Sequence, residues 1–265
     1  MKKIVLLAMA LVLAFSSLAL AADVKVGGEV RYNLALPSQG DPAGSGEYRL
    51  KVNATIDDNT NGFLFWRAKN SAVAPTDLFY AEINTKLAGG TARFGKVEFG
   101  SSPWAIYGGI ASSQDGSYGI SYASADMNGL AFQGFVAPNA GKWDLAGEAT
   151  YKLLGGSVGV AVDKAGANDK AGFSVFGSYP VVADVLTVNA EVGKTYDEND
   201  VQIVGVSGAV SGVSYLAESD LKAKKTYVQG SYTVNSVVYT LSYQTGDGYT
   251  GGDKGKVNLQ AKIKF

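Results

Sequence analysis

The sequence of 265 residues carries 23 basic and 24 acidic side chains, 34 glycines and 15 tyrosines, and it contains neither cysteine nor histidine. The near-neutral charge argues against a nucleic-acid-binding protein. The missing cysteine and histidine argue against a disulfide framework, a zinc site and histidine-dependent catalysis. We therefore expect a protein that is not an enzyme and that needs no metal and no cofactor.

The N-terminus has the features of a secretory signal peptide. Lysines precede an apolar run that ends near Leu20, and Ala19-Leu20-Ala21 supplies the small residues of a cleavage site. We predict a signal peptide over residues 1–21 and a mature domain over residues 22–265. An uncleaved membrane anchor is the alternative. No later stretch approaches the roughly 18 consecutive apolar residues that a membrane helix needs.

Apolar and polar residues alternate along most of the mature sequence, which is typical of β-strands with one apolar and one polar face. In the first segment Val24, Val26 and Val30 share one face, while Glu29 and Arg31 share the other. Helical periodicity is nowhere sustained. We predict sixteen strands, at about 23–35, 46–57, 62–70, 77–88, 90–97, 117–124, 129–138, 143–153, 156–164, 170–179, 185–196, 201–209, 213–221, 226–234, 237–245 and 256–265.

The connectors alternate in length. Those after even-numbered strands are short, such as ADMN at 125–128, whereas most of those after odd-numbered strands are longer, such as 94–116 and GDGYTGGDK at 246–254. Short turns at one end and longer loops at the other are typical of an outer-membrane barrel with both termini on the periplasmic side. A soluble β-sandwich is the alternative interpretation.

Aromatic residues near strand ends favour the membrane barrel over the sandwich, because transmembrane barrels carry aromatic girdles at both interfaces. The polar face is charged along nearly its whole length, which suits a water-filled lumen better than a packed core. We therefore predict an all-β fold, a transmembrane antiparallel β-barrel of about sixteen strands. The girdle residues on the apolar face are Tyr32, Tyr48, Trp143, Tyr151, Tyr179, Tyr215, Tyr239 and Tyr243.

The C-terminal sequence VNLQAKIKF alternates and ends on an aromatic residue, Phe265, and it resembles the last strand of outer-membrane porins. GGTARFGKVEFG (89–100) and GSYGISYASADMNGLAFQGF (116–135) resemble the fifth strand and the next hairpin of the general diffusion porins of Gram-negative bacteria. The resemblance implies an outer-membrane location, recognition of Phe265 by the barrel assembly machinery, and a homotrimer in contact with outer-membrane lipid and lipopolysaccharide.

Segment 94–116 interrupts the alternation and forms the third loop on the long-loop side. In general diffusion porins this loop folds into the lumen and narrows the pore, and the glycines and Trp104 of the segment allow such a path. We predict a constriction in which the loop acids Glu98 and Asp115 face a basic wall. The wall contains all four arginines of the chain and two lysines: Arg31, Arg49, Lys51, Arg67, Lys69 and Arg93.

The function that these features predict is a water-filled channel for passive diffusion of small hydrophilic solutes and ions, with selectivity set by charges at the constriction. One alternative is a sugar- or anion-selective channel of the same fold, in which Phe63, Phe65 or Tyr80 forms a sugar track. Another alternative is a structural or adhesive barrel. An outer-membrane enzyme is the weakest alternative, because general acid–base catalysis near neutral pH most often uses histidine.

Overall fold

The computed structural model describes residues 23–37, 41–69, 76–97, 99, 117–139, 141–166, 170–245 and 255–265. In this part of the chain sixteen antiparallel strands form one closed barrel. The strands are β1 (Val24–Pro37), β2 (Ala43–Thr55), β3 (Thr60–Lys69), β4 (Thr76–Leu87), β5 (Gly90–Lys96), β6 (Tyr118–Ala123), β7 (Leu130–Asn139), β8 (Lys142–Leu153), β9 (Gly156–Lys164), β10 (Gly172–Val182), β11 (Leu186–Lys194), β12 (Asp200–Val210), β13 (Val213–Asp220), β14 (Lys225–Val234), β15 (Val237–Thr245) and β16 (Lys256–Lys264).

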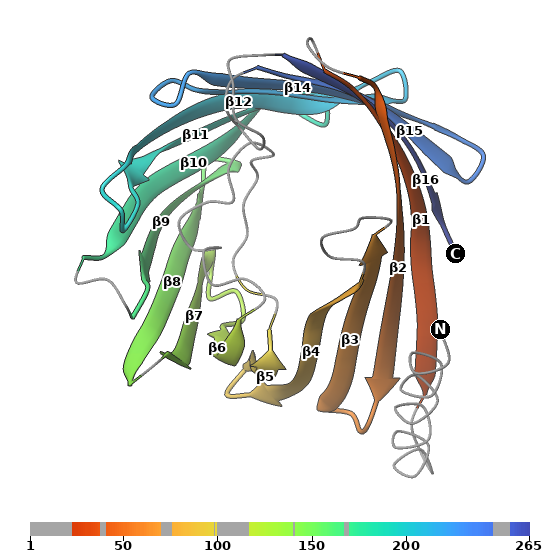
Figure 1. Cartoon of the computed structure of the whole chain (residues 1–265). Coiled ribbons are helices and arrows are strands. Elements are labelled where there is room, and N and C mark those ends of the chain that lie inside the picture. The colour runs from red at the N-terminus through yellow and green to blue at the C-terminus, as the bar shows by residue number, and fades with distance from the viewer. Residues whose placement is uncertain are drawn as a thin grey trace.

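Each strand pairs with its sequence neighbours, and β1 pairs with β16 to close the sheet (Figure 1). The fold class, the number of strands and their order are therefore as the alternation of the sequence predicts. Closure matters physically because an open sheet in lipid would leave a row of backbone N–H and C=O groups without partners. No helix in the described ranges is long and apolar enough to cross a membrane.

The short connectors after even-numbered strands are tight turns. Leu154 and Gly155 link β8 to β9 with φ values of 51° and 82°, and Ser211 and Gly212 link β12 to β13 with φ values of 50° and 80°. Two consecutive residues with positive φ define the type I′ geometry, whose twist matches that of the flanking strands. The sequence places glycine second in these turns, which is where the left-handed backbone favours it.

The turn between β6 and β7 is fixed by a carboxylate. Asp126 accepts hydrogen bonds from the Gly129 backbone N–H at 2.6 Å and from Lys152 Nζ on β8 at 2.6 Å. The Lys152 ammonium and the Gly129 N–H hold the pKa of Asp126 below its usual value. The turn is thus tied to the neighbouring hairpin.

The outer face of the barrel is apolar. Large hydrophobic side chains at alternating positions of almost every strand are exposed, among them Val158, Val160 and Val162 of β9. Seven of the eight predicted girdle aromatics are exposed on this face, and Tyr215 is half-buried because it lies over Gly208 and donates a hydrogen bond to the Val185 carbonyl. Such a continuous apolar surface is compatible with a lipid environment and not with water.

The seam between β1 and β16 is formed by the two ends of the described chain. Gly28 and Phe265 exchange both backbone hydrogen bonds, at 2.9 and 3.0 Å. A Cβ atom on Gly28 would lie 2.4 Å from the Arg49 carbonyl oxygen and 2.8 Å from the Phe265 ring. The glycine therefore makes room for the terminal aromatic ring, which is 71% exposed on the outer face.

Candidate functional site

Three of the four arginines lie side by side on the inner face. The strand register places Arg49 of β2 opposite Arg67 of β3, and Arg31 of β1 opposite Lys262 of β16. Arg93 lies farther along the wall, on β5, opposite Asn84 of β4. The predicted basic wall therefore continues across the β1–β16 seam, and Lys262 extends it.

Glu29 and Glu47 lie among these arginines. Glu29 Oε1 accepts hydrogen bonds from Arg31 Nη2 at 2.6 Å and from Arg49 Nη1 at 3.1 Å, and Arg49 Nε forms an ion pair with Glu47. Glu29 and Glu47 are 8% and 9% exposed. The wall is thus a network of ion pairs with an excess of positive charge. Acidic side chains are thus part of the same surface as the predicted basic residues.

An aromatic cluster supports the network from β3 and β4. Arg49 Cζ lies 5.7 Å and Lys51 Nζ 5.1 Å from the centre of the Phe65 ring, within the range of cation–π interactions. Phe65 stacks on Tyr80 at 5.7 Å, and Phe63 stacks on Tyr80 at 6.3 Å. Phe65 and Tyr80 are only 6% and 7% exposed, so these two rings offer little surface to a passing sugar.

Two residues that come just after β5 pack against the inner wall. Val97 and Phe99 are 0% and 2% exposed, and the Phe99 ring lies 5.3 Å from the ring of Phe135 on β7. Ala137 of β7 and Ala146 of β8 complete this buried cluster on the inner face.

A backbone hydrogen bond joins the two residues that flank the β5–β6 connection: the Val97 N–H donates to the Ser117 carbonyl oxygen at 3.1 Å. Glu98 and Asp115 lie outside the described residues. The strand register places the backbone of Lys69 on β3 opposite Glu47 of β2.

Acidic side chains occupy the inner face of the later strands, as the alternation predicts. They are buried, at 9% exposure or less: Asp144, Asp163, Glu191, Glu218 and Asp220. Asp144 accepts hydrogen bonds from the Asn139 side chain and the Gly166 backbone N–H, which gives it a role in holding the ends of β8 and β9 together.

Sequence reasoning missed the ion-pair role of Glu29 and Glu47. Both carboxylates occur two residues before an arginine on the same strand face, and this i, i+2 spacing is the signal that could have found them. Their cross-strand partners could not be found in this way. The Glu29–Arg49 contact depends on the register between β1 and β2, which the alternation does not determine.

A closed sixteen-stranded antiparallel barrel with an apolar outer face and a charged inner face has the architecture of the porins. Among solved structures the chain is similar to several mutants of the porin of Rh. blastica, one with a TM-score of 0.73 and 14% identity, covering 92% of this chain and 100% of that one. It is also similar to a loop-deletion mutant of OmpT, an outer membrane protein of Vibrio cholerae, with a TM-score of 0.66, 14% identity and coverage of 92% and 100%.

No model of a known protein family and no curated protein matches the sequence. At 14% identity the structural likeness demonstrates the fold.

Proposed function

We propose that this protein is an outer-membrane porin that forms a water-filled channel for passive diffusion of small hydrophilic solutes and ions. The observation that carries the proposal is the division of the barrel into two faces: exposed aliphatic and aromatic residues outside, and charged and amide side chains inside. A barrel in lipid needs the first face, and a polar lumen needs the second. The likeness to the Rh. blastica porin supports the same function.

The channel is narrowed by segment 94–116, which extends into the lumen after β5. The burial of Val97 and Phe99 against Phe135 supports this path, because both residues come just after β5 and belong to the buried cluster on the inner face. Glu98 and Asp115 then face the arginine network. A transverse field between acids and guanidinium groups sets the ion preference and orients polar solutes.

The N-terminal lysines, the apolar run and Ala19-Leu20-Ala21 support export with a signal peptide that is cleaved after Ala21. The resemblance to porins supports recognition of Phe265 by the barrel assembly machinery. The mature barrel is a homotrimer in contact with outer-membrane lipid and lipopolysaccharide. It catalyses no reaction.

Swelling of proteoliposomes tests the diffusion function. Vesicles that contain the purified protein should swell in isotonic solutions of small uncharged solutes, at rates that fall steeply as the solute grows, because passage is limited by size at the constriction. Vesicles without the protein are the control. No swelling with glycerol or a pentose would contradict the proposal.

A further inference from the structure

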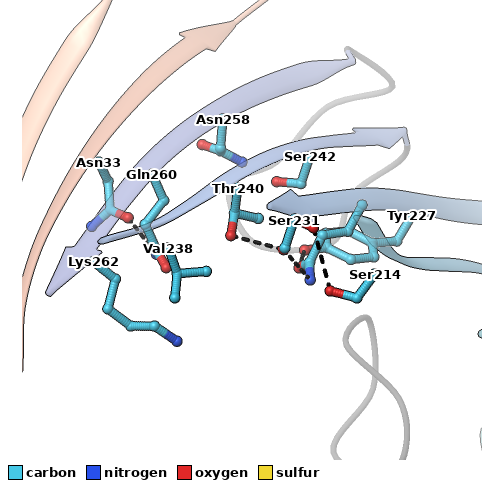
Figure 2. A pocket seen from close by; sticks show the side chains of 11 residues that line it. Asn33, Ser214, Tyr227, Ser231, Val238, Thr240, Ser242, Asn258, Gln260 and Lys262 are labelled. Atoms are coloured by element: carbon cyan, nitrogen blue, oxygen red, sulfur yellow. Dashed lines mark hydrogen bonds between the residues drawn. The ribbon is translucent and has the colours of Figure 1, made fainter. Parts of the chain in front are cut away.

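A second site lies on the inner face of β13 to β16 and β1, where a cavity of about 500 Å³ is lined by amides and hydroxyls (Figure 2). Its volume falls within the roughly 300–1,000 Å³ of small-molecule sites. Among the described residues that line it, Lys262 is the one charged side chain. The chemistry of this region therefore differs from that of the ion-pair network around Arg49.

A chain of hydrogen bonds organises the side of the cavity formed by β14 and β15. The Tyr227 hydroxyl donates to Gln229 Oε1 at 2.6 Å, Gln229 Nε2 donates to Ser231 Oγ at 3.3 Å, and Ser231 Oγ lies 2.9 Å from Thr240 Oγ1. Tyr227, Gln229 and Ser231 lie two residues apart along β14, so their side chains project from the same face of the strand. These contacts hold the polar atoms in place before any ligand arrives, which reduces the entropy lost on binding.

The opposite side of the cavity crosses the barrel seam. Gln260 Nε2 of β16 donates to Asn33 Oδ1 of β1 at 2.7 Å. A side-chain amide has two N–H donors and a carbonyl oxygen with two lone pairs, so each of these groups offers further donor and acceptor positions. Figure 2 shows Asn33, Gln260 and Lys262 at one end of the site and Tyr227 and Ser231 at the other.

We propose that this amide–hydroxyl cavity is a binding site for a neutral polyhydroxylated solute, such as a sugar or a polyol. A sugar hydroxyl both donates and accepts hydrogen bonds, and the hydroxyl and amide groups that line the cavity can do the same. The Tyr227 ring adds an apolar surface for the C–H groups of a sugar. A neutral ligand fits because a charged ligand would need more than the single ammonium of Lys262 to offset its desolvation.

This proposal rests on the proposed channel function and deepens it. A site inside a channel has to bind strongly enough to favour entry and weakly enough to allow release. An open cavity with hydrogen bonds and a single aromatic ring meets that condition. The site would give the barrel a preference for sugars beyond its size limit.

Two variants and a control test the proposal. Ser231→Ala combined with Thr240→Val removes two hydroxyls that bond to each other, and Gln229→Met removes the amide between Tyr227 and Ser231. Thr187→Val on the inner face of β11, outside the cavity, is the matched control. All three keep the net charge, so ion selectivity should not change.

Maltose is the probe, and sodium gluconate is the charged comparison. Maltose binding is measured by saturation-transfer NMR on the full barrel in micelles and by maltose-induced current fluctuation in planar bilayers. We expect wild type and Thr187→Val to bind maltose equally, and the cavity variants to bind roughly fivefold more weakly or worse, since each lost hydrogen bond removes about 1 kcal/mol.

The outcomes separate this inference from the channel function. Conducting channels without maltose binding, or cavity variants that bind as well as the control, would overturn the inference and leave the channel standing. Maltose binding in micelles without any conductance would support the site and contradict the channel. Gluconate binding that exceeds maltose binding and disappears in Lys262→Gln would overturn the neutral-ligand assignment.

Discussion

Arg49 combines ion pairs and a cation–π contact on the inner wall. Its guanidinium contacts Glu29 and Glu47, and it lies over the Phe65 ring. Arginine suits this position because its planar group can hydrogen-bond two carboxylates while it stacks on an aromatic ring. Lysine at position 51 contacts the same ring without these carboxylates, which makes it a natural control.

We predict that Arg49→Met destabilises the barrel by about 2 kcal/mol more than Lys51→Met, because it removes the Arg49 guanidinium from buried Glu47 and one of the two guanidinium groups that contact buried Glu29. Both variants lose one positive charge and a cation–π contact, so the difference isolates the ion pairs. Urea unfolding of the refolded barrel in micelles, followed by tryptophan fluorescence, measures it. Equal stabilities of the two variants would contradict this role of Arg49.

Arg67 and Arg93 test the electrostatic role of the wall. Replacing both with serine removes two positive charges from the inner face, so the reversal potential in a salt gradient should shift toward cation selectivity. The shift should shrink at high salt, where screening shortens the range of the field. An unchanged reversal potential would mean that the basic wall does not lie at the constriction.

The ion-pair network illustrates what a sequence can and cannot show at the residue scale. The alternation of apolar and polar positions is enough to place Arg31, Arg49 and Arg67 on the inner face. The structure confirms that the three lie on neighbouring strands. Their pairing with Glu29 and Glu47 depends on cross-strand register. Register is set by turn geometry and packing over many residues, so it does not follow from the alternation.

At the scale of elements, the sixteen strands could be predicted because alternation and turn residues agree along the chain. The ends are less well determined. The second strand was expected at 46–57 and is observed as Ala43–Thr55, because Gly44, Ser45 and Gly46 join the hydrogen-bonded ladder without contributing to the hydrophobic pattern. Backbone hydrogen bonds do not depend on side-chain hydropathy, so the hydropathy pattern does not show where a strand ends.

The β1–β16 seam offers a second test. We predict that Gly28→Ala impairs folding of the barrel, because the added Cβ would meet both the Arg49 carbonyl and the Phe265 ring. Gly46→Ala on β2 is the matched control, since a Cβ there meets nothing within 4 Å. The fraction of heat-modifiable, folded protein on unheated denaturing gels measures the effect.

Gly28→Ala should yield a smaller folded fraction than wild type, and Gly46→Ala should yield the same fraction as wild type. If both variants fold like wild type, the close packing of Phe265 over Gly28 does not contribute to closure of the barrel.

At the scale of the whole molecule, the outer face of the sheet suits lipid and the inner face suits water. Exposed valines, leucines and aromatic residues cover the outside, while ion pairs, amides and hydroxyls cover the inside. The sequence predicts this division through its period of two. The presence of an amide–hydroxyl cavity between the charged regions of the inner face could not be predicted in the same way, because it requires the order and register of strands that are distant in sequence.

Single-channel recording in planar lipid bilayers tests the central claim most directly. We predict that the purified mature barrel inserts and produces steady, ohmic conductance steps that persist over a range of voltages, because a polar lumen stays open to water and ions. Addition of a nonelectrolyte too large to enter should leave the steps unchanged, whereas a small one should reduce them. Insertion of folded barrels without any conductance would contradict the account.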